Sequence, residues 1–155
     1  MSERGMDVAA IVATEADRDA LADLAAAIEA EDPDTATGEG LRAFLQRFGP
    51  LDSRGQTTLL IGVLSAQPVG FLCATVVPKL DRRRGFLYVD ELYVLAEHRR
   101  RGVGTALLRA ALDRARVLEL SGVRLLARPG NRAAAALYTA LGFAVGDSRF
   151  YELCV

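Results

Sequence analysis

The chain has 155 residues, of which 51% are hydrophobic, and a formal net charge of −1 at pH 7. This length suits one domain with a continuous core, so we expect residues 1–155 to form a single domain. The near-neutral charge and the lack of interleaved aromatic residues disfavour nucleic-acid binding. No apolar run is long enough to span a membrane, no signal peptide is recognisable, and a chain with two cysteines is not expected to have a disulfide framework. We therefore expect a soluble, cytoplasmic protein without a membrane partner.

The charges are distributed unevenly along the chain. Residues 1–52 carry 12 acidic and 4 basic side chains, a balance of −8, whereas residues 53–155 carry 8 acidic and 15 basic side chains, a balance of +7. The basic part suits a polyanionic ligand and the acidic part suits a cationic one. Solvated helix faces and loops are the alternative explanation.

The N-terminal third predicts one strand and two helices. Val8–Val12 is typical of a short strand, and the residues from Thr14 to Asp17 resemble a capping box that starts a helix ending near Ala30. Its apolar residues recur at helical spacing and should be buried: Leu21, Leu24, Ala25 and Ile28. A second helix is predicted from about Glu39 to Phe48.

A change to β-rich sequence follows. Thr57–Leu64 and Val69–Val77 predict a hairpin, and Phe86–Val94 predicts a third strand that contains the adjacent carboxylates Asp90 and Glu91. Neighbouring residues of a strand point to opposite faces, so only one of the two should face a substrate unless a bulge intervenes.

The remaining sequence alternates helices and strands. A helix is predicted from Thr105 to the Ser121-Gly122 stop, a strand at Val123–Ala127 and a helix at Asn131–Leu141. Two short strands, 143–145 and 150–154, should end the chain. The prediction is an α/β (α+β) fold: a mixed, mostly antiparallel twisted sheet of about seven strands, flanked by about four helices and containing one parallel crossover.

The turn after the third strand has the chemistry of an anion site. It reads Arg99, Arg100, Arg101, Gly102, Val103, Gly104 and Thr105. Glycines let successive amides at a helix start converge on a phosphate, although an ordinary turn beside solvated arginines is the alternative. A dinucleotide fingerprint would need a glycine where Leu107 stands, and a Walker loop a lysine where Thr105 stands.

These residues resemble the acyl-CoA pyrophosphate loop of the GNAT acyltransferase superfamily. A second GNAT signature resembles the run from Asn131 to Tyr138 followed by Leu141-Gly142-Phe143. Within the superfamily, the run from Pro68 to Arg100 is most similar to the aminoglycoside 3-N-acetyltransferases.

The resemblance implies a GNAT fold, acetyl-CoA as cofactor and an amine acceptor. It implies a cofactor site made of the turn, Asn131, Tyr138 and main-chain groups at the end of the preceding strand: Leu92, Tyr93 and Val94. It implies that Tyr138 donates a proton to the CoA sulfur. The strand acid of the aminoglycoside enzymes aligns with Glu91, and that of the polyamine enzymes with Asp90.

The chemistry of acyl transfer explains why such residues are needed. An alkylammonium with a pKa near 10 must lose a proton before it attacks, and the departing thiolate must gain one. We favour Glu91 as the base, with Asp90 or an ordered water as alternatives. Either carboxylate could instead pair with Arg82, Arg83 or Arg84, and Tyr138 could be a core residue. The sole histidine, His98, cannot form a metal site alone, so no metal is expected.

Three functions remain open at this level. The leading prediction is an acetyl-CoA-dependent N-acetyltransferase acting on a primary amine of a small cationic molecule, aminoglycoside-like or polyamine-like. The alternatives are a protein or peptide N-acetyltransferase and a non-catalytic acyl-CoA-binding sensor. The sequence does not identify the acceptor or the acyl-chain specificity, and a homodimer is left open.

Overall fold

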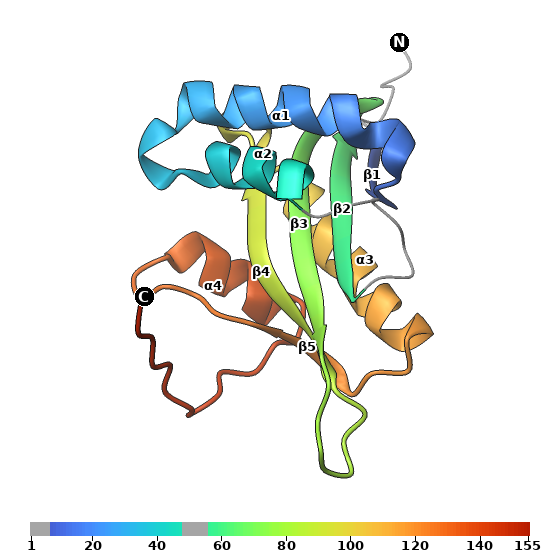
Figure 1. Cartoon of the computed structure of the whole chain (residues 1–155), viewed down its shortest axis with the longest axis vertical. Helices are drawn as coiled ribbons and strands as arrows, with labels where there is room; N and C mark the ends of the chain where they lie inside the picture. The colour runs from blue at the N-terminus through green and yellow to red at the C-terminus, as the bar shows by residue number, and fades with distance from the viewer. Residues whose placement is uncertain (1–6, 48–55) are drawn as a thin grey trace.

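The computed structural model describes residues 7–47 and 56–155, which form a five-stranded sheet with helices on both faces (Figure 1). The strands are β1 (Val8–Val12), β2 (Thr57–Leu64), β3 (Gln67–Val77), β4 (Phe86–Val94) and β5 (Gly122–Leu125). The main helices are α1 (Arg18–Glu31), α2 (Thr37–Arg47), α3 (Val103–Val117) and α4 (Arg132–Ala140). The strand order is β1-β2-β3-β4-β5; only the β4–β5 pair is parallel.

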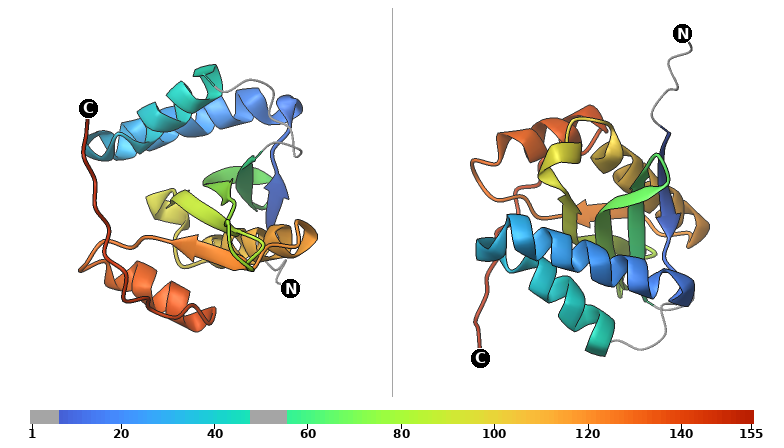
Figure 2. Two further views of the ribbon diagram at one scale, coloured as in Figure 1. Left: turned by 60° about the horizontal axis from the view of Figure 1, so that its bottom comes forward. Right: turned by 90° about the horizontal axis from the view of Figure 1, so that it is seen from above.

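Alternating side chains divide the core between the two faces of the sheet. Leu59, Ile61 and Phe71 pack with buried residues of α1 and α2, whereas Leu60 and Leu72 pack with buried residues of α3. Figure 2 shows α1 and α2 as one layer and α3 on the opposite side of the sheet. This period of two is what a sheet covered on both faces requires.

The predicted capping box and the predicted buried apolar residues of the first helix are both confirmed. The Thr14 amide donates a 2.8 Å hydrogen bond to the Asp17 carboxylate, as in a capping box. All four predicted stripe residues of α1 are buried. The second helix begins two residues earlier than predicted, and Phe48 lies outside the described residues.

Two glycines of α2 have opposite surroundings. A Cβ at Gly38 would lie 2.5 Å from the Ala25 carbonyl oxygen and 2.7 Å from the Glu29 amide nitrogen, whereas a Cβ at Gly40 would meet nothing within 4 Å. Gly38 therefore lets α2 approach the backbone of α1, and Gly40 has no such role.

This contrast predicts opposite effects of one substitution. Gly38→Ala should force the helices apart and lower stability by about 1–3 kcal/mol, which lowers Tm by about 3–10 °C. Gly40→Ala should raise stability by up to about 1 kcal/mol, because alanine is the better helix former. Thermal unfolding followed by circular dichroism measures both, and a Gly38→Ala protein as stable as the wild type would contradict the close approach.

The prediction of about seven strands is wrong for the described residues, which form five. Residues 143–145 and 150–154 lie in no strand, and the red C-terminal chain in Figure 2 runs past the side of the molecule. Val145 is 98% exposed and Leu153 is 89% exposed, so no described helix or sheet covers these apolar side chains. β-propensity needs a pairing edge to produce a strand, and this segment does not pair with β5.

Candidate active site

A β-bulge in β4 places both strand carboxylates on the same face of the sheet. Cys73 pairs with Glu91 and Ala74 with Val89, which leaves Asp90 as the extra residue. Val89 and Leu92 therefore both pack on the α3 side, although a regular strand would turn them to opposite faces. Asp90 and Glu91 share the other face, toward α2. The sequence had left this outcome open.

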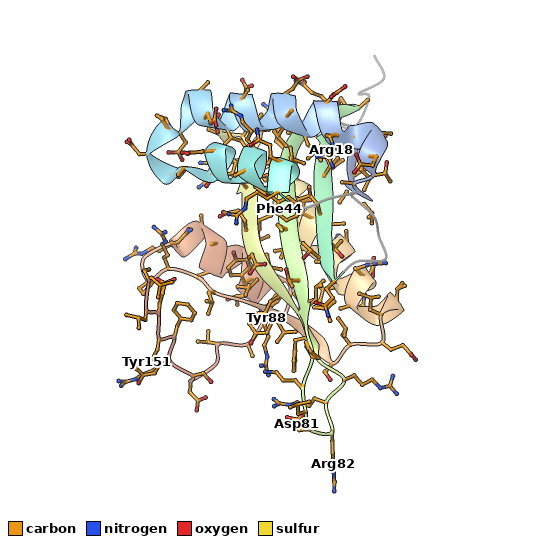
Figure 3. All side chains as sticks on the ribbon, viewed as in Figure 1. Arg18, Phe44, Asp81, Arg82, Tyr88 and Tyr151 are labelled. Carbon is orange, nitrogen blue, oxygen red and sulfur yellow. The ribbon has the colours of Figure 1, made fainter. Side chains whose placement is uncertain are left out.

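The two carboxylates line a pocket of about 230 Å³ between the sheet and α2. Its other walls come from the α1–α2 connection, α2, β2 and β3: Thr35, Ala36, Thr37, Gly40, Leu41, Phe44, Leu59, Phe71 and Cys73. Figure 3 labels Phe44, which projects from the side of α2 nearest the strands. The pocket thus combines an apolar wall with an acidic end.

The two carboxylates at the acidic end have different surroundings. The hydroxyl of Thr75 on β3 donates a 3.1 Å hydrogen bond to Asp90. Loss of hydration raises the pKa of Glu91, and the neighbouring Asp90 charge adds to this rise, while the Leu92 amide and Arg128 oppose it. A glutamate with a raised pKa is a better proton acceptor for an ammonium than an ordinary one.

Two of the three arginines of the β3–β4 connection engage other acids. Arg83 forms a 2.5 Å ion pair with Asp81, and Arg84 lies 3.4 Å from Glu119. Figure 3 shows Asp81 and Arg82 at the far end of this connection. Within the described ranges, no ion pair joins these arginines to Asp90 or Glu91, so the ion-pair explanation of the two carboxylates loses its support.

The end of β4 extends beyond its parallel partner. β5 pairs with β4 only from Phe86 to Val89. Leu92, Tyr93 and Val94 follow this ladder, so β5 does not pair with their main-chain groups. Arg99 folds back toward them: its Nε donates a 2.9 Å hydrogen bond to the Val94 carbonyl, and its guanidinium lies 5.3 Å from the centre of the Tyr93 ring.

The arginine-glycine turn leads directly into α3. Gly102 has a φ of 86°, a left-handed conformation that glycine adopts without strain. The first helical hydrogen bond runs from the Ala106 amide to the Gly102 carbonyl, so the amides of Val103, Gly104 and Thr105 belong to the unsatisfied first turn. These amides, with the exposed Arg100 and Arg101, could hold a phosphate.

The fourth helix lies against this turn. A Cβ at Gly104 would be 3.2 Å from Leu137 of α4, the residue before Tyr138. The Tyr138 ring lies 5.9 Å from the Phe143 ring, and burial and the charge of Glu91 raise the pKa of its hydroxyl. The fold therefore brings the turn, Tyr138 and Glu91 into one region. Asn131 caps α4: its side-chain oxygen accepts a 3.1 Å hydrogen bond from the Ala134 amide.

Two of the N-terminal acids support the structure. Glu31 accepts 2.9 Å hydrogen bonds from the Tyr93 hydroxyl and from the Ala96 amide, and Glu29 forms an ion pair with Arg42. The lining of the pocket includes neither residue. The acidic excess of the first third therefore contributes partly to packing between α1, α2 and the end of β4.

The sequence analysis gave no site role to three residues in or beside the pocket. Thr75 is a hydrogen-bond partner of Asp90, and Phe44 and Phe71 belong to the apolar wall. Both phenylalanines occur at positions where the sequence pattern indicates ordinary core. Nothing in the sequence distinguished Thr75, because its relation to Asp90 depends on the register of β3 against β4.

The described residues contain no group of three potential metal ligands. In the same part of the chain, no helix has the length and apolar character needed to cross a bilayer. The features present are a turn of arginines and glycines at a helix start, a pocket with two carboxylates, and a half-buried tyrosine whose pKa is raised by burial and by Glu91. They suit the class of transferases whose donor carries phosphate groups.

Comparison with known proteins gives the family. The sequence model of the acetyltransferase (GNAT) family matches residues 21–143. The chain therefore belongs to the acetyltransferase (GNAT) family. The predicted superfamily is therefore confirmed, and members of this family use acetyl-CoA, whereas the aminoglycoside 3-N subtype stays a prediction.

Curated relatives match over part of their length. N-acetyltransferase family 8 member 3 of Rattus norvegicus is 36% identical over 104 residues, which are 67% of this chain and 41% of the relative. Its Mus musculus counterpart is 35% identical over the same share of each protein. The match thus spans about two fifths of the length of these relatives.

Solved structures show the same fold. An aminoglycoside acetyltransferase from an uncultured soil metagenomic sample has a TM-score of 0.78 at 24% identity, covering 97% of this chain and 100% of that chain. A ribosomal-protein-alanine N-acetyltransferase from Brucella melitensis has a TM-score of 0.73 at 21% identity, covering 96% and 99%. The aminoglycoside N-acetyltransferase AAC(6')-Iy in complex with CoA has a TM-score of 0.72 at 16% identity, with 99% of both chains covered.

Proposed function

We propose that the chain transfers the acetyl group of acetyl-CoA to the primary amine of a small molecule that is cationic at neutral pH. The observation that carries this proposal is the bulge at Asp90, which turns two adjacent carboxylates toward one pocket. An ammonium group complements such a pair in charge. The aminoglycoside-like and polyamine-like acceptors expected from the sequence share this group.

Each part of the site has a role in the proposed reaction. The amides and arginines at the start of α3 hold the CoA phosphates, and main-chain groups of Leu92, Tyr93 and Val94 hold the pantetheine arm. Glu91, assisted by Asp90, accepts a proton from the acceptor ammonium. The amine nitrogen forms a bond to the thioester carbon, the carbon–sulfur bond breaks, and Tyr138 gives its proton to the departing thiolate. The nitrogen loses its second proton as it becomes an amide, and this proton restores the Tyr138 hydroxyl by way of water.

Cofactor binding is tested by thermal unfolding. Acetyl-CoA at about 100 times its dissociation constant should stabilise the protein by about 2.7 kcal/mol, which raises Tm by about 5–10 °C. Gly104→Asp should abolish this rise, because it adds a negative charge where phosphate would bind. Gly104→Ala is the matched control: it makes the same contact with Leu137, without the charge. An equal rise in the wild type and in Gly104→Asp would contradict the turn as the phosphate site.

Turnover is tested by release of the CoA thiol with a panel of spermidine, aminoglycosides and peptides with free N-termini. Thiol release with a small amine supports the proposal. Preference for peptides would support the protein-acetylating alternative. Binding of acetyl-CoA without turnover of any amine would support the sensor alternative.

A further inference from the structure

The pocket beside Asp90 and Glu91 has a lining that distinguishes among amine acceptors. Four large apolar side chains line it: Leu41, Phe44, Leu59 and Phe71. All of these except Phe44 belong to the buried core. Its titratable residues are Cys73, Asp90 and Glu91. Burial, with the two carboxylate charges adding to it, raises the pKa of Cys73 to about 12, so this thiol is neutral at pH 7.

The negative charge of the pocket is therefore confined to one end. Asp90 and Glu91 can bind one ammonium group, and the rest of the lining is mainly apolar, with Thr35 and Thr37 as its other polar residues. A second ammonium inside the pocket would lose its hydration without gaining a carboxylate, which is costly. An alkyl or aryl group would instead be stabilised by leaving water.

The size of the pocket also favours a small apolar group. Its volume of about 230 Å³ is below the roughly 300–1,000 Å³ of sites that enclose a drug-sized ligand. The pocket itself therefore takes only a compact part of a ligand.

We propose that the pocket is an acceptor subsite for a primary amine that carries a compact apolar group, with the ammonium at Asp90 and Glu91 and the apolar group against Phe44 and Phe71. This inference rests on the proposed function and narrows it. A polyamine can offer a methylene segment to the pocket, whereas an aminoglycoside offers chiefly hydroxyl and ammonium groups.

The test is a series of acceptors that keep the ammonium and vary only the tail. Thiol release is measured with n-propylamine, n-butylamine, n-pentylamine and n-hexylamine, and with amino alcohols of equal length in which the terminal methyl is a hydroxyl. KM should fall about fourfold for each methylene that enters the pocket, and then become constant once the pocket is filled. Each amino alcohol should have a KM at least about tenfold above that of its alkylamine.

A pair of glycine variants tests the location of the subsite. Gly40 lines the pocket, and a Cβ there meets nothing within 4 Å, so Gly40→Leu should fill the pocket without disturbing α2. We expect Gly40→Leu to raise the KM of n-hexylamine about tenfold or more and to remove the dependence on chain length. Gly146→Leu, at an open position outside the lining, is the matched control and should keep wild-type kinetics.

The outcomes separate this inference from the proposed function. Turnover with a KM that is independent of chain length, or with amino alcohols or aminoglycosides as the better acceptors, would overturn the apolar subsite and leave the acetyltransferase proposal intact. An unchanged chain-length dependence in Gly40→Leu would overturn the assigned pocket. Absence of thiol release with every amine, while acetyl-CoA still binds, would remove the proposed function and this inference together.

Discussion

Replacing Tyr138 with phenylalanine is expected to lower kcat about 10- to 1000-fold while leaving the affinity for acetyl-CoA nearly unchanged. Proton donation to the thiolate stabilises the transition state and contributes little to ground-state binding, so the loss should fall on kcat. The ring should keep its 5.9 Å contact with Phe143, which preserves the fold. Single-turnover kinetics, in which chemistry is observed directly, is the appropriate measurement.

The pKa of Tyr138 gives a second measurable quantity. Burial and the charge of Glu91 raise this pKa above 10, so the hydroxyl carries its proton throughout the neutral range. The wild-type rate should decline only in strongly alkaline solution, and Tyr138→Phe should lack this decline. Tyr151→Phe, which alters an 85% exposed tyrosine, is the control. An unchanged single-turnover rate in Tyr138→Phe would make Tyr138 a packing residue.

Glu91→Gln is expected to have the other large effect, a reduction of kcat/KM of about 10²- to 10⁴-fold, as for loss of a general base. Only the deprotonated carboxylate can accept the proton, and the pKa of Glu91 is raised above its usual 4.5. Wild-type activity should therefore fall with decreasing pH at a pH above that of an ordinary glutamate. This acidic limb should be absent from the residual activity of Glu91→Gln.

Stability should change in the opposite direction to activity. Because the folded protein holds the Glu91 proton more tightly than the unfolded chain, the charged carboxylate destabilises the fold at pH values above its folded pKa. Glu91→Gln should thus be at least as stable as the wild type at neutral pH, and any gain should vanish below about pH 4, where the carboxyl group is protonated in both states. Urea unfolding at several pH values measures this.

Asp90→Asn is the matched control for Glu91→Gln. It changes the adjacent carboxylate, which accepts the hydrogen bond from Thr75, and should reduce the rate less. A larger loss in Asp90→Asn would make Asp90 the base. Near wild-type rates and pH profiles in both variants would indicate that an ordered water accepts the proton, and would contradict a base at either residue.

Local sequence determined most of the elements and the family. The four-residue apolar stripe of α1 lies at helical spacing, and the burial of all four residues follows from that spacing. The apolar runs of β2, β3 and β4 and the glycine-bearing turn before α3 are likewise local patterns. The proposed phosphate site would use consecutive amides at one helix start, so a local sequence pattern is enough to predict it.

The arrangement of the pocket was decided by the tertiary structure. Whether Asp90 and Glu91 share a face depends on the register between β3 and β4, and a shift of one residue changes the face of every side chain beyond it. The approach of Phe44 to Phe71, the hydrogen bond from Thr75 to Asp90 and the contact of Gly104 with Leu137 join residues distant in sequence. The last residues have strand-like sequence but lie in no strand, because a strand exists only where another edge pairs with it.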